Sequence, residues 1–170
     1  CVQVPYQLLN PSAGRNVDAN FAEENHGNVI ATCQRHGMGA FAIRVLAGGA
    51  LAGQPPSPHT FKTPFFPLDL YRRDEQRAQC LTAVLPPGVS LKEAAVRFSL
   101  SHEGVTSAIV GLGSPGQVDE ITRYAAAGPL EAALVDRFTE ELATVTPVQL
   151  GRCNARQLRR LQKIPAERAR

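Results

Sequence analysis

The sequence lacks long apolar runs, paired cysteines and spaced metal-binding residues, and each of these absences excludes a class of protein. No stretch of the 170 residues approaches the roughly eighteen apolar residues that cross a membrane, and no basic-then-apolar leader opens the chain. The four cysteines lie far apart without a C-x-x-C pair, so neither a zinc site nor a disulfide framework is indicated. The four histidines show no ligand spacing. We therefore expect a soluble, cytoplasmic protein without a metal site.

Enough apolar residues are present to build one core, because 44% of the chain is hydrophobic and its length is that of a single domain. The pattern alternates between three β-like runs and five helical stretches. These are the β-like runs 2–6, 40–46 and 106–111 and the helical stretches 20–37, 69–85, 90–102, 115–127 and 129–142. The alternation predicts an α/β protein with parallel strands, although three strands are too few to close such a sheet.

A glycine-rich motif follows the third β-like run. Gly111, Gly113 and Gly116 form G-x-G-x-x-G, and Ser114 and Gln117 are spaced as a helix cap directly after it. A Rossmann dinucleotide site would need a second strand ending in an acidic residue about twenty positions later, whereas residues 130–142 have a helical pattern. The motif instead predicts a phosphate pocket made of backbone N–H groups at a helix start, as occurs after the seventh and eighth strands of TIM barrels.

Three segments together resemble the C-terminal half of an aldo-keto reductase. VQVPYQLLN (2–10) resembles the sixth barrel strand of that family, GMGAFAIRVLAGGALAG (37–53) its seventh strand and loop, and GVTSAIVGLGSPGQVDEI (104–121) its eighth strand and following helix. Order and spacing agree across roughly residues 2–143. The resemblance implies an α/β fold that is a partial (β/α)8 TIM barrel, roughly its C-terminal half, in residues 1–146.

The resemblance also implies a cofactor site for NADP or NAD. The residues placed there by position are Gln3 at the nicotinamide carboxamide, Leu46, Gly48 and Gly49 at the diphosphate, and Gly111, Ser114, Gln117 and Glu120 at the adenosine and its ribose phosphate. Arg44 stands where the family usually has a serine, and it could pair with a cofactor phosphate or be an ion-paired or snorkelling side chain. Positions 111 and 117 are not basic, so the choice between NADP and NAD is open.

The resemblance covers no catalytic residue. Family members use a tyrosine as general acid, tuned by Lys, Asp and His from the first half of the barrel, and those motifs are absent here. We expect Tyr6, Tyr71 and Tyr124 to be packing residues, because no lysine is placed to depress a phenol pKa. A three-stranded remnant should also expose the apolar residues Val4, Phe41, Ile43 and Ile109.

The expected function is therefore that of the cofactor-binding part of an NAD(P)-dependent oxidoreductase. As an isolated chain it should be inactive, with small aldehydes, ketones or sugars as substrates of the full-length enzyme. The expected partner is the missing N-terminal half-barrel or a second copy of the chain. The alternative is a non-catalytic half-barrel that binds a nucleotide or a partner.

The last segment of the chain is strongly basic. Residues 147–170 hold seven basic residues against one acidic residue, a net charge of +6, while the preceding 146 residues carry −3. A basic tail can bind nucleic acid, but no aromatic residue interleaves these arginines for base stacking. The simpler interpretation is a solvated, frayed terminus, and nucleic-acid binding is the lesser alternative.

Overall fold

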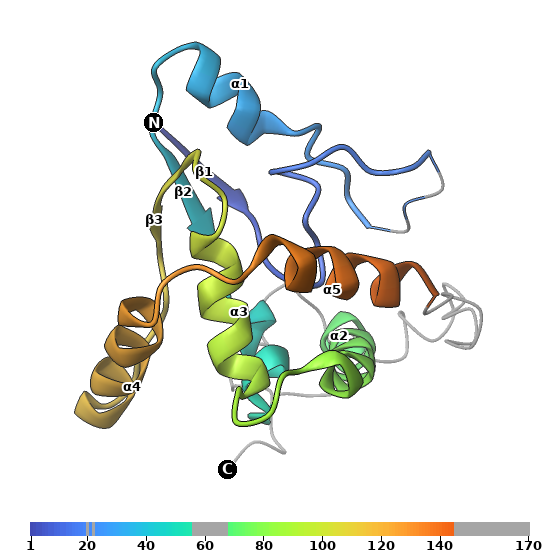
Figure 1. Ribbon diagram of the computed structural model, residues 1–170, viewed down its shortest axis with the longest axis vertical. Helices are drawn as coiled ribbons and strands as arrows, with labels where there is room; N and C mark the ends of the chain where they lie inside the picture. The colour runs from blue at the N-terminus through green and yellow to red at the C-terminus, as the bar shows by residue number, and fades with distance from the viewer. Residues whose placement is uncertain (20, 22, 56–67, 145–170) are drawn as a thin grey trace, which may run out of the picture.

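The sheet at the centre of the fold has three parallel strands. In this computed structural model, residues 1–19, 21, 23–55 and 68–144 are described, so the basic tail lies outside the described residues. The strands β1 (Val2–Pro5), β2 (Ala40–Ile43) and β3 (Val105–Ala108) lie side by side in the order β1-β2-β3 (Figure 1). The predicted parallel α/β arrangement is confirmed.

Helices connect and follow the strands, because parallel neighbours need crossover connections. They are α1 (Val29–Arg35), η1 (Ala47–Ala52), α2 (Leu68–Leu81), η2 (Thr82–Val84), α3 (Leu91–Leu100), α4 (Pro115–Ala126) and α5 (Ala132–Thr144). The caps predicted for two of them are present: the hydroxyl of Ser90 accepts a hydrogen bond from the N–H of Glu93, and the hydroxyl of Ser114 accepts one from Gln117.

The predicted beginning of the first helix is wrong. The pattern suggested a helix from residue 20, but α1 begins at Val29. Gly27 and Asn28 have φ angles of 62° and 50°, in the left-handed region that a right-handed helix cannot contain. Polar side chains bond the preceding loop instead, as Ser12 accepts from the N–H of His26 and donates toward the carbonyl of Glu24. Local bonding of this kind competes with helix formation.

The two faces of the sheet differ in burial. Val4 and Ala42 lie on one face and are 6% and 0% exposed, while Gln3 and Ser107 lie on the other and are exposed. Successive side chains of a strand point to opposite faces, which explains the difference. The expectation that Val4 is exposed is therefore wrong, whereas Ile109 is 45% exposed as expected. We call the face of Gln3, Phe41 and Ser107 the open face.

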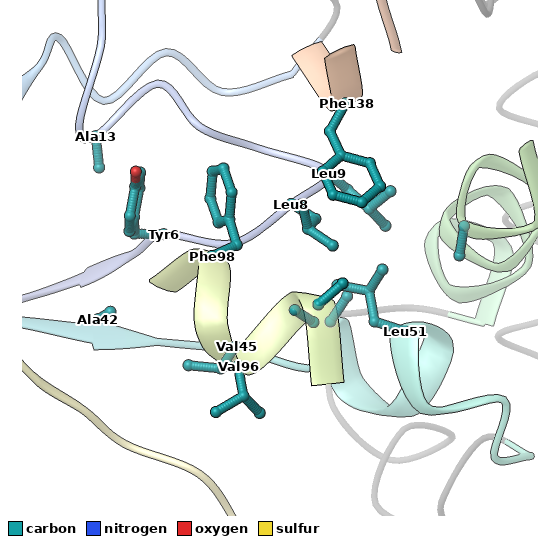
Figure 2. Packing of buried hydrophobic residues seen from close by; sticks show 14 of the residues in the cluster. Tyr6, Leu8, Leu9, Ala13, Ala42, Val45, Leu51, Val96, Phe98 and Phe138 are labelled. Carbon is teal, nitrogen blue, oxygen red and sulfur yellow. The ribbon is translucent and has the colours of Figure 1, made fainter. Parts of the chain in front are cut away.

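The core lies between the sheet and helices α2, α3 and α5. Figure 2 shows Tyr6 beside Phe98 of α3, Val45 beside Val96, and Leu8 and Leu9 near Phe138 of α5. The rings of Tyr6 and Phe98 have centroids 5.1 Å apart. Residues that directly follow β1 thus anchor two helices. Among the described helices, none has both the length and the apolar character required to cross a membrane.

Candidate cofactor-binding site

Two loops leave neighbouring strands at the carboxyl edge of the sheet. Residues 44–53 follow β2 and residues 109–114 follow β3, and these strands are parallel neighbours. The carboxyl ends of parallel strands lie on the same side of a sheet, where barrels and open α/β sheets bind their ligands. The loops after β2 and β3 hold six of the nine predicted site residues, Gln117 and Glu120 lie on the helix α4 that follows, and Gln3 lies on β1.

The loop after β2 has an unusual backbone. Arg44, Ala47, Gly48 and Gly49 have φ angles of 58°, 49°, 68° and 110°, all in the left-handed region. Two of the four, Arg44 and Ala47, are not glycine. A left-handed backbone at a residue other than glycine costs conformational free energy, and residues of this kind cluster at ligand-binding sites. The turn is fixed by hydrogen bonds from the N–H of Ala47 to the carbonyl of Arg44 and from Gly49 to Leu46, at 2.7 and 2.9 Å. The step from Leu46, with a φ angle of −99°, to the left-handed Ala47 is of the kind that directs successive N–H groups to one side and binds anions.

The loop after β3 ends in a capped helix start. Ser114 caps α4 and Pro115 occupies its first turn. The side-chain oxygen of Gln117 accepts a hydrogen bond from the N–H of Gly113 at 2.7 Å, and this bond holds the loop against the helix. The N–H of Gly116 lies in the first turn, where no intrahelical acceptor exists.

Open space surrounds the glycines of this loop. A Cβ atom built on Gly111 or Gly116 would meet no heavy atom within 4 Å. First-turn N–H groups and the positive end of the helix dipole favour an anion in such a place. The donors present therefore fit a phosphate group, which is the part of a dinucleotide that the resemblance implies at these loops.

Gln3 lies on β1, away from the two loops in sequence. Its Cα is paired with that of Phe41, whose partner on β3 is Ser107, so the three residues share the open face. Gln3 is exposed. In a closed barrel this face would point to the interior, and the role that the resemblance gives to Gln3 stays a prediction.

Arg44 lies beside a negative charge. Burial lowers the pKa of the Arg44 guanidinium, and the nearby carboxylate of Asp74 on α2 opposes that change. Asp74 is itself buried, and its pKa is raised by that burial although Arg73 and Arg77 act against the rise. No local pattern indicated Asp74, because thirty residues separate it from Arg44.

Glu120 is bonded to neighbouring side chains. One carboxylate oxygen pairs with the ammonium of Lys92 on α3, and the other accepts a hydrogen bond from the Tyr124 hydroxyl at 2.7 Å. These bonds lower the pKa of Glu120, so the group stays negative. Sequence reasoning missed Lys92. Its one local signal is its place in the first turn of α3, where the helix dipole disfavours a cation.

The three tyrosines are engaged in structural contacts. Burial raises the pKa of Tyr6 to about 12, while Arg15 acts in the opposite direction. The hydroxyl of Tyr71 donates to the carbonyl of Gln54, and that of Tyr124 bonds to Glu120. A general acid at neutral pH needs a lowered pKa, the opposite of the change at Tyr6. Among the described residues, no group of three or more His, Cys, Asp or Glu side chains could hold a metal ion.

Comparison with known proteins defines the class. The model of the aldo/keto reductase family matches residues 1–142, and the chain therefore belongs to this family, whose members are (β/α)8 barrel oxidoreductases. Two solved structures, the holo and apo forms of an aldo-keto reductase from Bacillus halodurans, are each 20% identical to the chain, with a TM-score of 0.56. Both matches cover 82% of this chain, but 41% of the holo chain and 42% of the apo chain. The chain thus spans about two-fifths of their length. No curated protein matches it.

Proposed function

We propose that this chain is the cofactor-binding, C-terminal part of an NAD(P)-dependent aldo-keto reductase, in which β1, β2 and β3 are the sixth, seventh and eighth barrel strands. The reaction of the whole enzyme is reversible hydride transfer between a nicotinamide and a carbonyl or alcohol. The observation that carries the proposal is the left-handed loop after β2, set beside the capped start of α4 at one edge of the sheet. Family membership supports the chemistry, and the partial coverage of the relatives supports a partial barrel.

The residues of the chain bind and orient the cofactor. Leu46, Gly48 and Gly49 border the diphosphate, and Arg44 adds a positive charge at the start of that loop. Gly111, Ser114, Gln117 and Glu120 line the adenosine side. Gln3, on the open face, positions the carboxamide. When bound, the nicotinamide supplies or accepts the hydride.

The charges around α4 bear on the choice between NADP and NAD. The 2′-phosphate of NADP is an additional anion, and in the described residues the cation that faces Glu120 from α3, Lys92, is already paired with that carboxylate. Gly111 and Gln117 contribute no charge. We therefore leave NADP and NAD as equal candidates, to be separated by their affinities.

The proton donor of the reaction is assigned to the other half of the barrel. The isolated chain is then a cofactor platform without turnover, and small aldehydes, ketones or sugars are substrates of the full-length enzyme. A cytoplasmic location is part of the proposal, supported by the wide spacing of the cysteines.

Titration of the purified chain with NADPH and NADH, followed by nicotinamide fluorescence, tests the proposal. We expect saturable binding that NADP or NAD displaces. Gly48→Asp and Ser114→Glu should each weaken it about tenfold or more, because either substitution puts a carboxylate where a phosphate is expected. Circular dichroism checks that each variant is folded.

Matched controls separate charge from backbone strain and from cap loss. Gly37 is exposed and has a φ angle of 61°, close to that of Gly48, but it lies between α1 and β2 at the opposite edge of the sheet. Ser90 caps α3 as Ser114 caps α4. Gly37→Asp and Ser90→Glu should keep the wild-type affinity. Unchanged affinity in both site variants would overturn the placement of the site.

The alternative is a half-barrel that binds a nucleotide or a partner without chemistry. The structural contacts of all three tyrosines favour it, since none is poised as a proton donor. Both candidates predict nucleotide binding without turnover by the chain alone. The two candidates differ once an N-terminal half-barrel is supplied. Turnover by the resulting complex supports the reductase. A stable complex without turnover supports the binding module.

A further inference from the structure

We propose that Tyr71 and Asp74 of α2 are positioning residues of the cofactor site, which hold the two ends of the loop after β2. The inference rests on the function proposed above, because it concerns how the loop that borders the diphosphate keeps its shape. Tyr71 and Asp74 lie three residues apart on α2, so they share one face of the helix. Tyr71 is 1% exposed and Asp74 is 4% exposed. Because both are buried, they act through the loop and not by contact with a ligand.

Tyr71 holds the far end of the loop. The helix α2 packs against η1, which forms the second half of this loop. The Tyr71 hydroxyl donates a hydrogen bond to the carbonyl of Gln54, and the N–H of Gln54 donates to the carbonyl of Gly49 at 3.2 Å. A Cβ atom built on Gly49 would lie 3.9 Å from the Tyr71 ring and 3.7 Å from Gln54. The ring of Tyr71 therefore lies beside the left-handed residue Gly49, and its hydroxyl closes the loop at Gln54.

The Tyr71 hydroxyl keeps its proton at neutral pH. Burial raises the pKa of Tyr71, and the nearby carboxylate of Glu75 raises it further. A neutral phenol donates to a carbonyl oxygen, whereas a phenolate can only accept. Removal of the hydroxyl would leave the Gln54 carbonyl without this donor and would release the far end of the loop from α2.

Asp74 holds the near end of the loop through its charge. Burial lowers the pKa of Arg44, the left-handed residue that opens the loop, and the nearby carboxylate of Asp74 opposes that change. Asp74 is itself fixed by Arg73 at 3.0 Å and by Arg77 at 3.6 Å. A fixed carboxylate reduces the number of orientations open to the Arg44 guanidinium. Less conformational entropy is then lost when Arg44 binds a phosphate.

The helix that carries both residues is fastened to the rest of the fold. Glu23, in the loop after β1, pairs with Arg73 and with Arg77. Arg77 also donates to the carbonyl of Leu9, a fully buried residue. The helix α2 therefore gives the loop after β2 a rigid support.

Titration of the full chain with ligands of two kinds tests the role of Tyr71. NADPH, NADH and ADP contain a diphosphate, whereas adenosine does not; fluorescence follows the first two, and displacement of the bound dinucleotide follows the others. Tyr71→Phe should weaken binding of the three diphosphates about fivefold and leave adenosine unchanged, because the loop after β3 and α4 form the adenosine side. The matched control is Tyr6→Phe, which removes the hydroxyl of another buried tyrosine and should keep the wild-type affinities.

Asp74→Asn gives a second test, in which electrostatics alone predicts the opposite result. Removal of a negative charge near a phosphate site would by itself strengthen anion binding. We expect binding of NADPH, NADH and ADP to weaken at least threefold, because Arg44 loses the group that orients it. Asp119→Asn, which removes an exposed carboxylate from α4, should not weaken binding.

The outcomes separate this inference from the function on which it rests. A wild-type chain that binds none of these ligands would overturn both. Wild-type binding that Tyr71→Phe and Asp74→Asn leave unchanged would keep the cofactor site and overturn the positioning roles. Equal losses for adenosine and ADP in Tyr71→Phe would assign Tyr71 to the stability of the fold alone, and stronger binding by Asp74→Asn would overturn the role of Asp74. Circular dichroism checks that each variant is folded.

Discussion

Tyr6 shows how one position can suggest a catalytic role that its surroundings do not support. It follows β1 directly, on the edge where barrel enzymes hold their reactive groups, yet its side chain is turned into the core between Phe98 and His102. The residue is 5% exposed. Desolvation disfavours the phenolate and moves the pKa of Tyr6 from 10.0 to about 12.

The raised pKa of Tyr6 makes stability depend on alkaline pH. The pKa of the phenol is 10.0 in the unfolded chain and about 12 in the folded chain. The stabilising contribution of the neutral phenol is therefore fully present below pH 10.0 and is lost as the pH rises through about 12. A shift of this size corresponds to about 3 kcal/mol of unfolding free energy. We expect the wild-type chain to lose stability relative to Tyr6→Phe over this interval, as measured by urea unfolding at a series of pH values. Parallel profiles for the two proteins would show that the Tyr6 pKa is not raised.

Sequence reasoning was most successful where a residue acts within its own turn. The caps at Ser90 and Ser114 follow from spacing of three residues along the chain, and both are present. Lys92 could not be assigned in this way, because its partner Glu120 is twenty-eight residues away. The roles given to the nine cofactor residues remain predictions that the nucleotide titration tests.

At the level of elements, ion pairs fasten the loop after β1 to α2. Both carboxylate oxygens of Glu23 are used, one at 2.6 Å from Arg73 and the other at 3.1 Å from Arg77. Arg77 also donates to the carbonyl of Leu9 at 2.8 Å, and Asp74 pairs with both arginines. These side chains are largely buried, so the pairs are shielded from solvent.

Removal of the Glu23 charge should loosen this loop. We expect Glu23→Gln to lower the unfolding free energy by about 1–3 kcal/mol, because it leaves two arginines to share one carboxylate in a partly buried place. Urea unfolding measures the change. The matched control is Glu24→Gln, since Glu24 is exposed and contributes its backbone carbonyl to the loop. Equal stability of the two variants would show that the ion pairs of Glu23 add nothing.

Prediction of the elements failed where tertiary contacts decide. The helical stretch from residue 20 was expected from its apolar spacing, but the left-handed turn at Gly27 and Asn28 and the bonds of Ser12 set the beginning of α1. The pairs of Glu23 join residues 50 and 54 positions apart, for which local pattern gives no signal. The parallel direction of β1, β2 and β3, in contrast, was predicted from the alternation of strands and helices.

At the scale of the whole molecule, nucleotide binding and catalysis should be separable. We expect the isolated chain to bind NADPH without oxidising it in the presence of a small aldehyde, because Tyr6, Tyr71 and Tyr124 are all held in structural contacts. The loss of nicotinamide absorbance measures turnover, with a complete aldo-keto reductase as the positive control. Turnover above the spontaneous rate that Tyr6→Phe abolishes would instead assign the proton donor to this chain.

The pairing of β2 with β3 has a consequence for how the protein is made. Ala42 lies opposite Ala108, so the sheet joins parts of the chain that are far apart in sequence. During translation, β1 and β2 leave the ribosome long before the third strand has been synthesised, and contacts between distant residues form slowly. Until then Ala40 and Ala42, both fully buried in the finished fold, have no complete sheet to join. The nascent chain should therefore depend on chaperones most strongly in the interval between the synthesis of β2 and that of β3.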